Sequence, residues 1–266
     1  MNRFKGKKVW ITGASSGIGE ALSYRFARES AILILTARNM EKLDKVASRC
    51  SETGAVSVKI LPFDLGNLDG LASLAGQAWS AFGGIDIFIN NAGISQRGSV
   101  TDTELSVIQK VIDVDFYAPV ILVKHILPLM AAHGGGQLAV TSSISGLFGF
   151  PLRCAYSSAK HALYGFFETV QAEYYDKGIR VTIICPGRVR TNISVNALEA
   201  DGSLHNRMDP GQSGGITPEK AADKIVRALF RKKREVLVGG KELLMVYVKR
   251  FFPGLCARMA RTIDPT

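Results

Sequence analysis

Short apolar runs alternate with segments of helical length along almost the whole chain. Seven runs read as strands, and most are apolar without a break, as in strands buried on both faces of a parallel sheet. They are residues 8–11, 32–35, 58–61, 85–89, 138–141, 181–184 and 236–238. The segments of helical length are 19–30, 40–54, 68–82, 103–132, 155–177 and 218–232. Repeated strand–helix units predict an α/β fold, a doubly wound, Rossmann-like sheet of about seven parallel strands with helices on both faces.

A single domain of this type accounts for the length and composition. The 266 residues, 47% of them hydrophobic and 21% charged, are enough to bury one large core. We expect residues 1–240 to form a Rossmann-type catalytic domain and residues 241–266 to be a basic and apolar extension of it. Within the domain, residues 193–216 are rich in Asn, Ser, Asp and Gly, and are long enough to form a lid over a substrate.

The sequence shows no sign of secretion, of a membrane span or of a metal site. It has no uninterrupted apolar stretch of about 18 residues, and no signal-peptide core precedes the first strand. The cysteines share no metal-ligand spacing with the histidines. They are Cys50, Cys154, Cys185 and Cys256. We therefore expect reduced thiols and a cytoplasmic protein.

A glycine-rich turn follows the first strand. Residues 12–19 read Thr-Gly-Ala-Ser-Ser-Gly-Ile-Gly and lead into the first helix. In this setting glycines let backbone N–H groups approach a pyrophosphate at the helix N-terminus, although the spacing differs from G-x-G-x-x-G. The turn predicts dinucleotide contacts by Gly13, Ser15, Ser16, Gly17, Ile18 and Gly19.

The residue after the second strand indicates which dinucleotide is bound. A carboxylate there hydrogen-bonds the adenosine ribose of NAD, but this chain has Arg38. A guanidinium can bind a 2′-phosphate through paired hydrogen bonds, so Arg38 favours NADP. After the third strand, Asp64 and Leu65 are candidates to contact the adenine edge.

Four further motifs complete a pattern. They are Asn90-Asn91-Ala92-Gly93, Ser143, Tyr156-Ser157-Ser158-Ala159-Lys160 and Pro186-Gly187-x-x-x-Thr191. With the glycine-rich turn they extend over residues from about 7 to 240, and they resemble the short-chain dehydrogenase/reductase family in its single-domain, Tyr-x-x-x-Lys form. The resemblance implies a homodimer or homotetramer built on the helices 103–132 and 155–177. It also implies nicotinamide-cofactor contacts by Asn91, Ala92, Gly93, Tyr156, Lys160, Pro186, Gly187, Val189 and Thr191.

The Tyr and Lys motif also follows from the chemistry of carbonyl reduction. The reaction needs a hydride donor and a proton donor at the oxygen, and a Tyr hydroxyl with an ordinary pKa of about 10 needs a nearby cation to act at neutral pH. Tyr156 and Lys160 are four residues apart on one helix face, so the ammonium is predicted to lower the pKa of that hydroxyl. Ser143, at the end of the fifth strand, can hydrogen-bond the substrate oxygen. By resemblance, Lys160 also reaches the nicotinamide ribose.

One residue departs from the family pattern. The family usually has an Asn in the helix after the fourth strand, where its backbone carbonyl holds a water that relays protons to the Lys, and this chain has Asp115 there. The backbone role survives the change. An ionised carboxylate near Lys160 would partly offset the ammonium and disfavour a phenolate. We therefore expect an active enzyme with an alkaline-shifted profile for alcohol oxidation.

Candidates to line a substrate pocket lie in three segments. They are Ser95, Gln96 and Arg97, then Leu147, Phe148, Phe150, Pro151, Leu152, Arg153 and Cys154, and the loop after Thr191. Phe148 and Phe150 predict an apolar wall, and hence a lipid-like, steroid-like or aromatic carbonyl compound, although core packing explains them equally well. Arg97 or Arg153 is alternatively a site for a substrate carboxylate or phosphate.

The net charge of +10 is concentrated near the C-terminus. Residues 217–266 contain 12 Lys or Arg and 5 Asp or Glu, which is +7 of the total. No base-stacking module accompanies this charge, so a solvated face is favoured over nucleic-acid binding. An apolar stripe in the same region, interrupted by Pro253, has three explanations: it packs on the body or a second subunit, closes over the substrate, or lies on an anionic membrane surface. The stripe comprises Leu244, Tyr247, Val248, Phe251, Phe252 and Leu255.

Two functions are compatible with these patterns. The favoured one is an NADP-dependent oxidoreductase that interconverts a carbonyl and a secondary alcohol on an apolar small molecule. Its predicted catalytic residues are Ser143, Tyr156, Lys160 and Asp115. The alternative is an NADP-binding regulatory or interaction protein in which Asp115 has weakened or silenced the chemistry. The intact Ser143, Tyr156 and Lys160 favour the enzyme.

Overall fold

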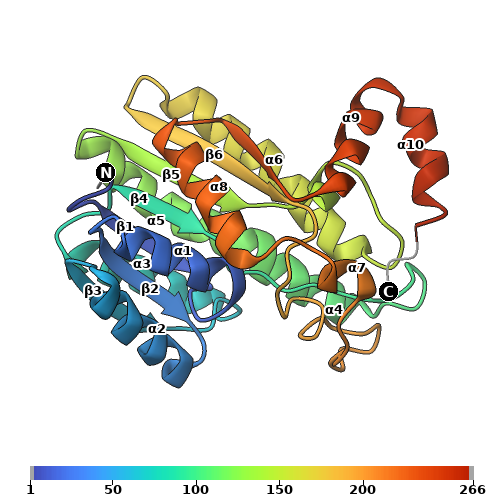
Figure 1. Cartoon of the computed structure of the whole chain (residues 1–266), viewed down its shortest axis with the longest axis horizontal. Coiled ribbons are helices and arrows are strands. Elements are labelled where there is room, and N and C mark those ends of the chain that lie inside the picture. The colour runs from blue at the N-terminus through green and yellow to red at the C-terminus, as the bar shows by residue number, and fades with distance from the viewer. Residues whose placement is uncertain (1–2, 264–266) are drawn as a thin grey trace.

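The structure is a computed structural model, and it describes residues 3–263. Its seven strands form one parallel sheet in the order β3-β2-β1-β4-β5-β6-β7, which confirms the predicted α/β fold (Figure 1). The strands are β1 (Lys8–Thr12), β2 (Ile32–Ala37), β3 (Ser57–Pro62), β4 (Ile87–Asn90), β5 (Gly136–Thr141), β6 (Ile179–Pro186) and β7 (Glu235–Val238). Residues 1 and 2 of the predicted domain 1–240, and residues 264–266 of the predicted extension 241–266, lie outside the described residues.

Helices cover both faces of the sheet. One face carries α1 (Gly17–Ala27), α2 (Met40–Thr53) and α8 (Pro218–Phe230). The other carries α3 (Leu71–Ala81), α5 (Ala118–Ala132) and α6 (Cys154–Tyr174), with α4 (Leu105–Ile112) packed beside α6. The short helical segments are η1 (Leu68–Gly70), η2 (Asp113–Tyr117), η3 (Ile144–Gly146), α7 (Pro210–Ser213), η4 (Lys241–Leu243), α9 (Leu244–Phe251) and α10 (Pro253–Ala260).

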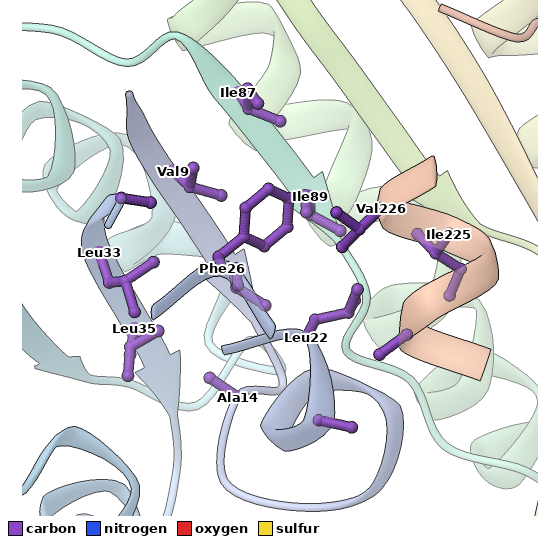
Figure 2. Packing of buried hydrophobic residues seen from close by; sticks show 14 of the residues in the cluster. Val9, Ala14, Leu22, Phe26, Leu33, Leu35, Ile87, Ile89, Ile225 and Val226 are labelled. Carbon is purple, nitrogen blue, oxygen red and sulfur yellow. The ribbon is translucent and has the colours of Figure 1, made fainter. Parts of the chain in front are cut away.

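Alternate residues of each central strand enter different cores. Val9 of β1 packs with Phe26 of α1 and Ile225 of α8 on one face (Figure 2). Trp10, the next residue, faces the other side and stacks on Phe88 with ring centroids 4.1 Å apart. Because both faces of the strand are buried, its sequence is apolar without a break.

The predicted helix 103–132 is divided into three parts. The α4 helix ends at Ile112, a π-helical turn covers Asp113–Tyr117, and α5 starts at Ala118. Within the π turn the side chain of Asp115 is buried and accepts a hydrogen bond from the backbone N–H of Ile94 at 2.7 Å. Single π turns of this kind occur frequently at functional sites.

The segments that leave the strands meet at the carboxyl edge of the sheet. Neighbouring strands β1 and β4 are followed by chains that run to opposite sides, because β2 and β3 lie beyond β1 and β5 to β7 lie beyond β4. Ligands of open α/β sheets bind at such a switch point. The topology therefore places any ligand between the loops after β1 and β4.

Candidate active site

The carboxyl edge of the sheet is hollowed by a cavity of about 1190 Å³. This exceeds the ~300–1,000 Å³ typical of a pocket for one small ligand, so it offers room for a cofactor and a substrate together. Its wall includes nearly all of the predicted cofactor residues. They are Gly13, Ser15, Ser16, Gly17, Ile18, Arg38, Asp64, Leu65, Asn91, Ala92, Gly93, Tyr156, Lys160, Pro186, Gly187, Val189 and Thr191. The predicted Gly19 and Asp115 lie behind the wall.

The glycine-rich turn brings backbone close to the cavity. Gly13 has a φ of +67°, and a Cβ there would come within 2.8 Å of the Ala92 Cα. A side chain at the buried Gly19 would overlap the carbonyl oxygen of Gly13, so Gly19 permits the close packing of the turn. Ser16, the N-cap of α1, makes no capping hydrogen bond with its side chain. The start of α1 thus retains N–H groups for an anion.

The loops after β1 and β4 are tied together by Thr12. Its hydroxyl accepts hydrogen bonds from the backbone N–H groups of Asn91 (3.0 Å) and Ala92 (3.2 Å). The Asn91 amide nitrogen donates to the Thr12 carbonyl, and the Asn91 amide oxygen accepts from the Thr141 hydroxyl at 3.2 Å. Asn91 therefore holds three strand ends in place beneath the cavity.

The end of β2 presents two cations to the cavity. Arg38 follows the strand, and Lys42 lies one helical turn further along. Asn39 between them caps α2, because its side chain accepts from the Lys42 N–H at 2.8 Å. Lys42 is not among the cofactor residues predicted from the sequence. Its spacing of four residues from Arg38 at a helix start was a usable signal.

The three predicted catalytic side chains face the same cavity from two elements. Tyr156 and Lys160 lie one turn apart on α6, and the Lys160 Nζ is 5.5 Å from the centroid of the Tyr156 ring. Ser143 comes directly after β5 as the N-cap of η3. Its hydroxyl accepts from the Ser145 N–H at 3.1 Å and donates to the Pro186 carbonyl at 3.3 Å. These bonds hold the Ser143 side chain at the cavity wall.

Asp115 is the buried partner of Lys160. One carboxylate oxygen lies 3.1 Å from the Lys160 Nζ, and both side chains are almost fully buried. The ammonium also donates to the Thr141 carbonyl at 3.0 Å. The predicted proximity of Asp115 to Lys160 is therefore a direct ion pair. Asp115 does not line the cavity itself, and its side chain contacts two residues that do, Lys160 and Ile94.

The ion pair keeps Lys160 protonated. Burial lowers the pKa of Lys160, but the Asp115 carboxylate and Tyr156 raise it more, so the pKa lies above its ordinary value. Burial raises the pKa of Asp115, and the Lys160 ammonium and the Ile94 N–H oppose this effect in part. At neutral pH the site thus has a fixed positive charge next to Tyr156.

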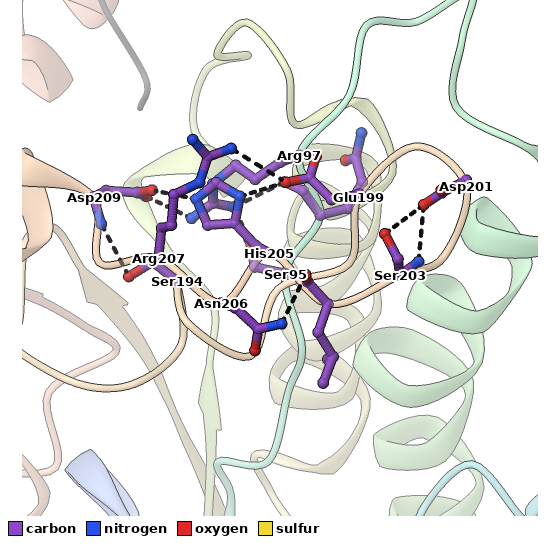
Figure 3. Close-up of polar contacts among 12 residues, drawn as sticks. Ser95, Arg97, Ser194, Glu199, Asp201, Ser203, His205, Asn206, Arg207 and Asp209 are labelled. Atoms are coloured by element: carbon purple, nitrogen blue, oxygen red, sulfur yellow. Dashed lines mark hydrogen bonds and ion pairs between the residues drawn. The ribbon is translucent and has the colours of Figure 1, made fainter.

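The loop over the substrate side of the cavity is fixed by a buried polar cluster (Figure 3). The Asp209 carboxylate lies 2.6 Å from the Arg97 guanidinium and 3.1 Å from that of Arg153. His205 links Asp209 to Glu199, with its ring nitrogens 3.3 Å and 2.6 Å from their carboxylates. Burial, followed by repulsion from Arg97, lowers the pKa of Arg153 to about 10.

The predicted substrate wall is only partly correct. Phe150 lines the cavity, but Phe148 is buried against Ile144 and Cys256 and belongs to a small core. Ser95, Arg97 and Arg153 line it, whereas Gln96, Leu147, Pro151, Leu152 and Cys154 do not. Loop residues 193, 196, 198 and 204 and the distant Ile263 complete this part of the wall.

Comparison with known proteins decides the family. The sequence model of the family described as short chain dehydrogenase matches residues 7–202, which is most of the chain. The chain belongs to the short-chain dehydrogenase family.

Relatives in this family are dehydrogenases or reductases. Dehydrogenase/reductase SDR family member 7B from Bos taurus is 37% identical over 257 residues, which cover 94% of this chain and 79% of that protein. A Burkholderia phymatum short chain dehydrogenase/reductase solved in complex with NAD has a TM-score of 0.84 at 23% identity, and the match covers 100% of this chain and 99% of that one. A metagenomic short-chain oxidoreductase in complex with NADP has a TM-score of 0.73 at 28% identity, covering 89% and 98%. As a short-chain dehydrogenase, the protein is an oxidoreductase that uses a nicotinamide cofactor.

The residues of the cavity fit such a cofactor. Gly13 and Gly19 let the turn pack closely on itself and on the loop after β4, and the start of α1 offers N–H groups to the pyrophosphate of a dinucleotide. Lys160 and Tyr156 line the same cavity. This short-chain dehydrogenase thus combines a dinucleotide cradle with an acid–base pair.

Proposed function

We propose that the protein interconverts a carbonyl and a secondary alcohol with NADP, and that its substrate is apolar. The observation that carries the proposal is the shared cavity of Ser143, Tyr156 and Lys160 with the glycine-rich turn. When bound, the reduced cofactor supplies the hydride. The side chains of the cavity then have to hold and protonate the oxygen that receives the electron pair.

In carbonyl reduction, Ser143 and Tyr156 act on the same oxygen. Ser143 exchanges its 3.3 Å hydrogen bond to the Pro186 carbonyl for one to the substrate carbonyl oxygen, and so orients the compound. As hydride reaches the carbonyl carbon, the C=O π electrons move to the oxygen, and the Tyr156 hydroxyl transfers its proton there. Alcohol oxidation is the same sequence reversed, with Tyr156 receiving the proton. In both directions the Lys160 ammonium stabilises the phenolate form of Tyr156.

Asp115 is proposed to set the pH range of the reaction. Its carboxylate partly offsets the ammonium on which Tyr156 depends. Replacing Asp115 by Asn removes that charge and keeps the shape. With Lys160 still protonated, the pH–rate profile for alcohol oxidation is expected to move to lower pH by about one unit, and a move to higher pH would show that the buried Lys160 loses its proton without the carboxylate. Asp69→Asn removes an equal charge from the exposed η1 turn and serves as the control. Superimposable profiles for Asp115→Asn and the unchanged protein would contradict the role.

The preference for NADP is supported by Arg38 and Lys42. No carboxylate follows β2, and the two cations line the cavity where the adenosine ribose would lie. Replacing Arg38 by Ala should raise the Kd for NADPH about tenfold or more and leave the Kd for NADH nearly unchanged, because only NADPH carries the 2′-phosphate. Fluorescence titration with each cofactor measures both constants.

The matched control for Arg38 is Arg49→Ala. Arg49 lies on α2, the helix that follows Arg38, but outside the cavity, and its guanidinium stacks over the ring of Tyr24. Its replacement should leave both Kd values as they are. Equal weakening of NADH and NADPH binding by Arg38→Ala would contradict the 2′-phosphate role.

An apolar substrate is supported by the apolar side chains in the cavity wall. Phe150, Ile144, Leu198, Leu204 and Ile263 all line it. Two of the cations that line the cavity, Arg97 and Arg153, are paired with Asp209. The wall therefore favours a bulky apolar ketone or aldehyde over a small sugar.

Self-association through α5 and α6 is also proposed. The helical run Leu105–Ala132 has a mean hydropathy of 1.5 over 18 residues, yet only 44% of that window is buried. Ile121 of α5 and Phe166 of α6 remain partly exposed on this side. A second copy packed here would cover them. Light scattering tests it, and the mass of a single chain would contradict it.

A further inference from the structure

We propose that the C-terminal hairpin, α9 and α10, docks on the surface of an anionic lipid bilayer. Figure 1 shows this hairpin standing out from the body next to the start of α6. Its helices are separated at Phe252, because Pro253 begins α10. A docking surface formed by two short helices differs from one continuous interfacial helix.

The outer side of the hairpin is apolar and exposed. Each helix carries large side chains at spacings of three and four residues, which places them on one face. They are Leu244, Tyr247 and Phe251 on α9, and Phe252, Leu255 and Met259 at and along α10. Between 39% and 66% of each of these residues is exposed. Monomeric proteins seldom expose so many large apolar side chains together, so the face calls for a partner.

The inner side of the hairpin is already packed. Val246 and Val248 of α9 and the buried Cys256 of α10 contact a small core that contains Ile144 and Phe148. A hairpin that only had to fold onto the body would need one apolar side. Packing of the hairpin on the body therefore does not account for the outer stripe.

The hairpin is held firmly beside the cavity. The Glu242 carboxylate at its base accepts hydrogen bonds from the backbone N–H groups of Arg188 (2.8 Å) and Gly240 (2.9 Å). Arg188 belongs to the cavity wall, and so does Ile263, which follows α10. A bilayer that contacts the outer stripe would lie close to the substrate side of the cavity. Direct supply of an apolar carbonyl compound from the bilayer is a consequence that rests on the proposed function.

The positive charge around the stripe favours binding to an anionic surface. Residues 241–263 contain one acidic residue, Glu242, and five basic ones, for a net charge of +4. The basic residues are Lys241, Lys249, Arg250, Arg258 and Arg261. Apolar side chains bordered by Lys and Arg are typical of helices that lie in the lipid headgroup region. A second copy packed on the same stripe would bring two such positive surfaces together, which disfavours that occupant.

Sedimentation with lipid vesicles tests the docking without cofactor or substrate. The purified full chain should pellet with vesicles of phosphatidylcholine and phosphatidylglycerol but not with phosphatidylcholine alone. The variant Phe251→Ser/Phe252→Ser should lower the partition coefficient about tenfold or more, through loss of buried apolar surface. Lys249→Glu/Arg250→Glu should lower it by a similar factor on anionic vesicles.

Matched controls separate docking from general surface effects. Val56→Ser/Val100→Ser removes two exposed apolar side chains elsewhere, and Lys233→Glu/Arg234→Glu reverses two adjacent exposed charges outside the hairpin. Both should bind vesicles as the unchanged protein does, and NADPH titration of every variant reports on an intact cavity. The proposal would be overturned if the protein did not pellet, or if it pelleted equally with both vesicle types. It would also be overturned, in favour of a second copy on the stripe, if the hairpin variants changed only the mass of the protein in solution.

Discussion

Replacing Tyr156 by Phe is expected to lower kcat about 10²–10⁴-fold, the range of a lost general acid–base group. The change removes one oxygen and keeps the ring, which is 9% exposed and packs with Ala155, Ala159 and Leu198. The substitution leaves the Lys160–Asp115 ion pair beside the ring in place. NADPH binding should therefore change little. Steady-state kinetics and fluorescence titration on the same samples measure the two effects separately.

Tyr174→Phe is the matched control for this prediction. Tyr174 is the last residue of α6 and lies outside the cavity, so loss of its hydroxyl should leave kcat unchanged. A Tyr156→Phe protein that retained normal turnover would show that another group protonates the substrate oxygen. A parallel loss of NADPH binding would instead assign Tyr156 to the cofactor site alone.

Replacing Asp209 by Asn is expected to cost about 3–5 kcal/mol in the free energy of unfolding. The carboxylate is 5% exposed and is the shared counter-charge of Arg97, itself 4% exposed, and Arg153. A neutral amide of the same size leaves the Arg97 guanidinium buried without its ion pair. Urea unfolding measures the loss, and limited proteolysis of the loop 193–216 shows whether the loop loosens first.

Asp201→Asn provides the comparison on the same loop. Asp201 is exposed, and its carboxylate accepts hydrogen bonds from the hydroxyl and the N–H of Ser203, which lower its pKa. Its replacement should leave the unfolding curve almost unmoved. If Asp209→Asn unfolded at the same urea concentration as Asp201→Asn, the buried cluster would not be what fixes the loop.

The fold could be predicted because its central strands are buried on both faces. Neither Ile32–Ala37 nor Ile87–Asn90 contains a charged residue. Each can therefore be predicted as a buried strand from its own sequence, without knowing which strands pair with it. The π turn at Asp113–Tyr117 could not be predicted in this way. In this turn the Asp115 carboxylate pairs with the Lys160 ammonium and accepts a hydrogen bond from the Ile94 N–H. These partners come together only when the sheet has folded.

The candidate site was predictable where its residues follow strand ends. Topology alone brings the turn after β1, Asn91 and Ser143 to one edge, so their sequence positions were sufficient. The substrate side of the cavity was not predictable, because the residues that pair there are far apart in the sequence. Arg97 and Asp209 are 112 residues apart and form the ion pair that fixes the loop. Likewise, only the packing of the hairpin distinguishes the buried Phe148 from Phe150 on the cavity wall.

The most direct test of the proposed chemistry follows the hydride itself. NADPH carrying deuterium at the transferred position would be incubated with the protein and a panel of bulky apolar ketones and aldehydes, and the products analysed by mass spectrometry. The account predicts an alcohol that contains a single deuterium at the former carbonyl carbon, formed faster with NADPH than with NADH. Tight NADPH binding with no labelled alcohol from any compound of the panel would contradict it, and would favour a nucleotide-binding regulator.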